Sequence, residues 1–177
     1  MKENQNNENK IVNRVATSGL ITIDLEDYYD KRERVLYDIK ENLFQGLILR
    51  EKDFREFIKN HDWSIYKNKN VGIICSVDAI VPTWAYMLLV SKIEPYAHAV
   101  VFGDISDLEQ YLFQEAFKKM DLTIYKDAKV VIKGCGNFPV PPFAYAEITR
   151  LLRPLASSIM YGEPCSTVPV YKKPRER

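Results

Sequence analysis

The fold of this chain is decided by a stretch that occurs twice, as Val81-Pro-Thr-Trp-Ala-Tyr86 and again as Val140-Pro-Pro-Phe-Ala-Tyr145. The same shift of 59 positions aligns residues 54–104 with residues 113–163 without a gap, and sixteen of the 51 aligned pairs are identical. An ungapped match of this length indicates one structural unit used twice. The sequence therefore predicts an internal duplication, with repeat one at residues 54–104 and repeat two at residues 113–163.

Each repeat has the pattern of helix, strand, helix, strand. A capping box precedes the first helix, as Asp53 with Glu56 in repeat one and as Ser106 with Glu109 in repeat two. Proline stands at the start of the second helix, where its missing N–H costs nothing. Because a strand–helix–strand connection of this length forms a right-handed parallel crossover, we expect an α/β fold with one mainly parallel sheet flanked by helices.

The second helices of the two repeats differ in character. The helix that contains Trp84 is apolar on nearly all sides, which favours a central, buried position. Its counterpart in repeat two carries Glu147, Thr149 and Arg150, which favours a position on the outside.

Segments outside the repeats complete the predicted domain. Residues 20–25, 35–39 and 47–49 have the pattern of short strands that extend the sheet or form a small flanking β element. We expect a single α/β domain over residues 11–171, preceded by a disordered polar tail at residues 1–10. The basic residues 172–177 are typical of a solvated end, with an electrostatic docking tail as the alternative.

Composition excludes several classes of partner. The net charge of +1 over 177 residues gives no field that favours nucleic acid or an acidic membrane. The N-terminus lacks the apolar segment of a signal peptide, and the most apolar run, residues 84–90, is too short to span a bilayer. Three cysteines without an export signal indicate reduced thiols, so we expect a cytoplasmic protein. A homo-oligomer is left open.

Chemistry-bearing residues gather where the predicted strands end. Ligands of an open parallel sheet bind beyond the carboxyl ends of its strands. All three cysteines fall there, and so do two carboxylates at matched repeat positions, Asp104 and Glu163. The cysteines are Cys75, Cys135 and Cys165, and further residues predicted to line the site are Ser76, Asp78, Asn137 and Ser166.

Three interpretations of the cysteines stay open. They are small buried hydrophobic residues, as free cysteines commonly are. They are thiolate ligands of zinc or of an iron–sulfur cluster, with Glu163 or Asp104 as an oxygen donor. They include one reactive thiol of a small enzyme, such as Cys135 beside a helix start. The two carboxylates bind a cation or cap the next helix.

Four segments resemble a bacterial family known only as domain of unknown function 2480. They are Cys75-Ser-Val-Asp-Ala-Ile-Val-Pro-Thr-Trp-Ala-Tyr86, Val101-Phe-Gly-Asp104, Lys133-Gly-Cys135 and Tyr161-Gly-Glu-Pro-Cys-Ser-Thr-Val-Pro169. The resemblance extends from Ile11 to Lys172 and supplies no catalytic residues. It implies a genomic neighbourhood with iron–sulfur assembly genes, which is an association and not a mechanism.

The leading hypothesis is therefore an accessory protein for iron–sulfur or metal handling, with iron–sulfur assembly proteins as partners. Its ligands are Cys75, Cys135 and Cys165, supplemented by Glu163 or Asp104. The alternatives are a thiol-dependent enzyme that acts on a small molecule and a non-catalytic structural or interaction domain with buried cysteines.

Overall fold

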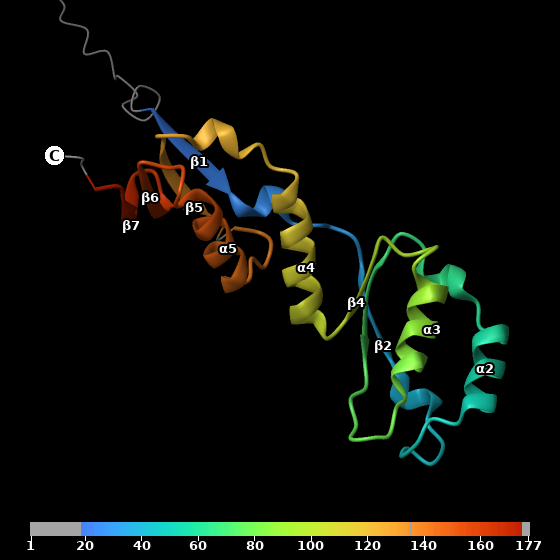
Figure 1. Cartoon of the computed structure of the whole chain (residues 1–177). Helices are drawn as coiled ribbons and strands as arrows, with labels where there is room; N and C mark the ends of the chain where they lie inside the picture. The colour runs from blue at the N-terminus through green and yellow to red at the C-terminus, as the bar shows by residue number, and fades with distance from the viewer. Residues whose placement is uncertain (1–18, 135, 175–177) are drawn as a thin grey trace, which may run out of the picture. The chain divides into compact units, whose positions relative to one another are not determined.

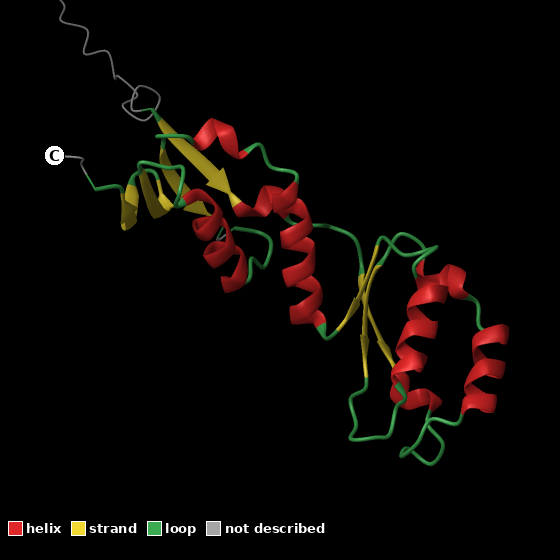
Figure 2. Ribbon diagram, viewed as in Figure 1, coloured by secondary structure: helices red, strands yellow, loops and turns green. Residues whose placement is uncertain are grey.

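The computed structural model describes residues 19–134 and 136–174. Over these residues the chain has four α-helices and two β-sheets, and six of the seven strands run parallel to a neighbour (Figures 1 and 2). The predicted mixed α/β class is confirmed. The prediction of one sheet was wrong. The strands of repeat one pair with residues 34–38 and the strands of repeat two pair with residues 20–24, so the two repeats form separate sheets.

Contacts within the chain divide it into two compact units. Unit one comprises residues 19–25, 121–134 and 148–174, and unit two comprises residues 26–120 and 136–147.

The sheet of unit two has three parallel strands in the order β2-β3-β4. The strands are β2 (Arg34–Asp38), β3 (Asn70–Ile74) and β4 (Ala99–Phe102). Side chains alternate between the two faces of a strand. Val71 and Ile73 of β3 are fully buried in a core shared with α2 (Glu51–Asn60) and α3 (Thr83–Ile93).

The other face of this sheet is covered by α4 (Ile105–Lys118), which contacts β3 and β4. Leu108 and Leu112, one helical turn apart, form a buried cluster with Ala99 of β4. Gly72 of β3 lies at the same level, opposite Val101. A Cβ atom at Gly72 would lie 2.8 Å from the carbonyl oxygen of Gly103, so this position has room for glycine only.

The sheet of unit one has four strands in the order β1-β5-β6-β7. They are β1 (Leu20–Asp24), β5 (Lys129–Lys133), β6 (Ser158–Glu163) and β7 (Ser166–Lys172), of which β7 alone runs antiparallel to its neighbour. Val130, Ile132 and Ile159 are buried in this sheet. Ile148 and Leu152, from the second half of α5 (Pro142–Leu152), are also fully buried.

Element bounds in the two repeats follow the shift seen in the sequence. The strands β3 and β5, the helices α3 and α5, and the 3-10 helices 63–66 and 122–125 differ by 59 positions in both bounds. Asn68 and Asp127, also 59 apart, have positive φ angles of 58° and 55°. These matches describe two similar arrangements and do not by themselves establish a duplication.

Several local predictions require correction. The helix α2 begins at Glu51 after Arg50, which makes no side-chain cap, so the box at Asp53 was wrong. Residues 47–49 form no strand, because Ile48 makes only isolated bridges. The strand β7 was not predicted, since proline and polar residues obscure its alternation. Residues 1–10 and 175–177 of the predicted tails lie outside the described residues, whereas Lys172 ends β7.

Candidate functional site

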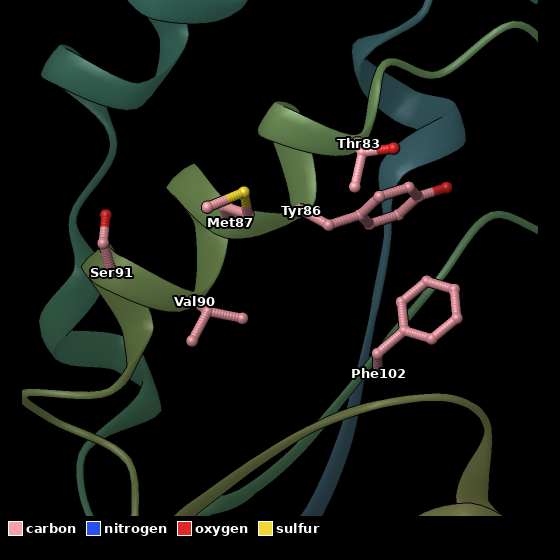
Figure 3. Close-up of a pocket in the computed structure, with 6 residues that line it drawn as sticks. All are labelled: Thr83, Tyr86, Met87, Val90, Ser91 and Phe102. Carbon is pink, nitrogen blue, oxygen red and sulfur yellow. The ribbon is translucent and has the colours of Figure 1, made fainter.

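The outer face of α3 and the end of β4 form a groove of about 640 Å³ within unit two (Figure 3). Six residues line this α3/β4 groove, and none of them is charged: Thr83, Tyr86, Met87, Val90, Ser91 and Phe102. The groove is apolar because only some of the apolar residues of α3 pack in the core and the others stay on its outer face. Ala85, Leu89 and Ile93, at helical spacing, face the sheet and are fully buried.

The prediction that α3 is central was therefore wrong in one respect. Its inner face is buried, but Met87 is 69% exposed and Val90 is 37% exposed on the outer face. Phe102, which ends β4, is 67% exposed. The sequence analysis did not identify these residues as a site. A signal was present, because α5 has polar residues at the matching positions, which indicates that the fold does not need apolar residues on this face of α3.

The aromatic rings of the groove contact each other directly. The ring centroids of Tyr86 and Phe102 lie 5.0 Å apart with an interplanar angle of 81°, the edge-to-face geometry that aromatic pairs favour. Burial raises the pKa of the Tyr86 hydroxyl, and electrostatic interactions with Cys75 and Asp38 raise it further. Tyr86 is therefore neutral at physiological pH and can act as a hydrogen-bond donor at the rim of the groove.

Cys75 lies near this groove, directly after β3. Its side chain is half-buried, and its thiol donates to the carbonyl oxygen of Val77 at 3.2 Å. The backbone N–H of Ser76 donates to Oδ1 of Asp38 at 3.1 Å. Burial raises the pKa of Asp38, but hydrogen bonds from Ser76 and Lys40 lower it overall, so this carboxylate stays ionised. Asp78, three residues on, is exposed.

Asp104 caps the helix α4. Its Oδ1 accepts the backbone N–H groups of Ser106 at 2.7 Å and of Asp107 at 3.2 Å. Asp107 completes a capping box, because its Oδ2 accepts the N–H of Asp104 at 2.9 Å. The cap predicted at Ser106 with Glu109 was therefore wrong by two residues, because the actual cap is Asp104 with Asp107. Of the two roles left open for Asp104, the structure gives it helix capping.

Glu163 and Cys165 belong to unit one, where β6 turns into β7. Nζ of Lys133 lies 3.8 Å from Glu163 and 3.0 Å from Asp24, so a cation already faces both carboxylates at this end of the sheet. Cys165 is exposed in the turn that joins the two strands, and Ser166 begins β7. Cys75 and Cys165 thus follow strands of different sheets.

Asn137 lies in a loop that encloses a carboxylate. The N–H groups of Asn137 and Phe138 donate to Oε2 of Glu26 at 2.8 Å and 3.3 Å, and the N–H of Gly136 donates to Oε1. Sequence reasoning missed Glu26, because its partners lie more than a hundred residues away. These contacts hold the loop that follows Cys135, a residue outside the described part of the chain.

Among residues 19–134 and 136–174, no three histidine, cysteine, aspartate or glutamate side chains gather in a way that could hold a metal ion. The three-cysteine site includes Cys135 and stays a prediction. Within the same residues, no helix has both the length and the apolar character that a membrane span needs.

Comparison with known proteins places the chain in a family. No curated protein sequence and no solved structure matches it. A family model described as "protein of unknown function (DUF2480)" matches residues 9–173, nearly the whole chain, which confirms the resemblance noted in the four segments. The chain is therefore a member of the DUF2480 family.

Proposed function

We propose that this protein is a non-catalytic binding protein whose α3/β4 groove docks an apolar segment of another protein. The observation that carries the proposal is the exposure of Met87 and Phe102, each about two-thirds open to solvent beside an uncharged groove. Covering a large apolar side chain stabilises a complex by about 1.5–3 kcal/mol. Contiguous exposed apolar surface of this kind is typical of interaction sites.

A protein segment suits the groove better than a small molecule. A small-molecule site encloses most of its ligand. Here Met87 and Phe102 are themselves mostly exposed, and Figure 3 draws them on one helix and one strand. A small ligand would stay largely in water, whereas a protein segment would cover the groove together with its margins.

The fold does not require apolar residues at these positions. We infer that the two repeats derive from one duplicated unit, in which Met87, Val90 and Ser91 of α3 correspond to Ala146, Thr149 and Arg150 of α5. The similar arrangement in repeat two carries small and polar residues there. The apolar outer face of α3 is therefore a property of this groove and supports a binding role.

Site-specific photo-crosslinking in cells tests the proposal. A benzophenone side chain at position 87 should give a discrete adduct with a second protein, and Phe102→Glu should remove this adduct by placing a charge in the groove. The matched control carries the same group at the exposed position 146, the equivalent site of α5. No adduct at position 87, or an equal adduct at position 146, would refute the groove as a docking site.

As a second function we propose an accessory role in iron–sulfur or zinc handling, with iron–sulfur assembly proteins as partners in a reducing cytoplasm. Its support is the position of Cys75 at the carboxyl end of β3, where parallel sheets bind ligands. Iron and zinc analysis of anaerobically purified protein should find metal that is lost in a variant with Cys135→Ser and Cys165→Ser. Retained stoichiometric metal in that variant would exclude these two cysteines as ligands.

A further inference from the structure

The strand β4 lies at an open edge of its sheet. The order β2-β3-β4 gives it one neighbour, and no described residue pairs with its other side. The N–H of Gly103 donates to the carbonyl oxygen of Ile73 at 3.0 Å, so this N–H points toward β3. Because backbone groups alternate along a parallel strand, those of Phe102 and Val100 point to the open side.

The corresponding strand in unit one is not open. β6 pairs with β5 in the register that β4 shares with β3, since Ile132 lies opposite Tyr161 and Ile73 opposite Phe102. The outer side of β6, however, carries the antiparallel strand β7, in which Val168 lies opposite Tyr161.

One side chain of β7 also contacts the residue that follows α5. Tyr171, opposite Ile159, places its ring 5.4 Å from the guanidinium carbon of Arg153, which follows α5. The chain thus contains, on one of two similar sheets, the strand that the other sheet lacks.

The α3/β4 groove lies on the same side as this open edge. Directly opposed residues of paired strands project to the same face of a sheet. A segment paired with β4 would therefore direct the side chain opposite Phe102 toward Tyr86 and Met87. Since no groove residue is charged, an apolar side chain suits this position, and the residue opposite Tyr161 in unit one, Val168, is also apolar.

We propose that the partner segment binds as an extended strand that pairs antiparallel with β4 and inserts alternate apolar side chains into the α3/β4 groove. This inference rests on the proposed function and specifies the form of its partner. Backbone hydrogen bonds to the groups of Val100 and Phe102 would supply affinity, and the groove would select the side chains, as in other cases of strand addition.

The probe is a synthetic peptide with the sequence of β7, Ser-Thr-Val-Pro-Val-Tyr-Lys, added to the isotope-labelled full-length chain. NMR titration should show saturable shifts of the amide signals of Val100 and Phe102. Phe102→Glu should abolish binding. The control Ile65→Glu changes an apolar residue of unit two that is 49% exposed outside the groove, and it should bind normally.

Two N-methylated peptides test the strand geometry. Adjacent N–H groups of a strand point to opposite sides, so methylation of Thr167 or of Val168 blocks only one side. One modified peptide should bind about tenfold more weakly or not at all, and the other should bind as the parent does.

Equal binding of both modified peptides would overturn strand pairing and leave the groove as a docking site. If the parent peptide does not bind but the adduct at position 87 persists, strand pairing would also be overturned. Loss of that adduct as well would overturn the proposed function itself.

Discussion

Substitution of Asp104 by alanine separates helix capping from metal binding. The carboxylate accepts two backbone N–H groups of the first turn of α4, those of Ser106 and Asp107. Alanine leaves both groups without this acceptor, whereas the backbone N–H of residue 104 is kept and still donates to Asp107. A ligand that is not also a cap would have no such effect on folding.

The magnitude follows from these contacts. Loss of an N-cap side chain costs about 0.5–2 kcal/mol. A carboxylate at a helix N-terminus adds about 0.3–1 kcal/mol through the helix dipole. We therefore expect Asp104→Ala to lower the free energy of unfolding by about 1–2 kcal/mol. Asp104→Asn keeps an acceptor oxygen and should cost no more than about 1 kcal/mol, the dipole contribution.

Urea unfolding followed by far-ultraviolet circular dichroism measures these differences. The matched control is Asp53→Ala, because Asp53 was also a candidate cap but makes only an exposed ion pair with Arg50. This control should change the free energy of unfolding by less than about 1 kcal/mol. Equal losses at Asp53 and Asp104, or an asparagine variant as unstable as the alanine variant, would refute the capping role.

Three further outcomes can be checked on the same purified protein. Gly72→Ala should lower the free energy of unfolding by about 1–3 kcal/mol in urea titrations, because its Cβ would meet the rigid carbonyl of Gly103 at 2.8 Å; an unchanged value would contradict this close approach. Burial raises the pKa of Asp30, but hydrogen bonds, including one from the N–H of Arg32, bring it below its ordinary value. The advantage of wild type over Asp30→Asn should thus be complete above about pH 4 and disappear as the pH falls through the folded-state pKa; a difference independent of pH would exclude this linkage. Glu26→Gln should speed amide hydrogen exchange about tenfold in the loop after β5, whereas unchanged exchange would show that other contacts hold this loop.

Local order was predictable because its signals are local. The proline before each second helix and the apolar runs of β3 and β5 identify the strand–helix–strand pattern without tertiary information. The division into two sheets was not predictable in this way. It depends on β1 pairing with β5 and β2 with β3, and each of these pairings joins segments far apart in the sequence.

The candidate site was missed for a related reason. Periodicity shows that α3 is apolar on most sides, but it cannot show how many sides the core covers. The core uses Ala85, Leu89 and Ile93, and the same helix leaves Met87 and Val90 exposed. The positions of the cysteines predicted a site at the strand ends, whereas the groove in the structure lies at a helix face beside a strand edge.

The end of β4 combines the open edge with the capping box. Phe102, Gly103 and Asp104 are consecutive, and Gly103 has a φ angle of 141°, at which a Cβ would collide with the Asp107 side chain. The box that starts α4 therefore holds the backbone next to the exposed strand in one conformation. A strand edge fixed before binding loses little conformational entropy when a partner pairs with it, and this favours affinity without additional contacts. The contacts that stabilise α4 thus also prepare the edge of β4 for a partner strand.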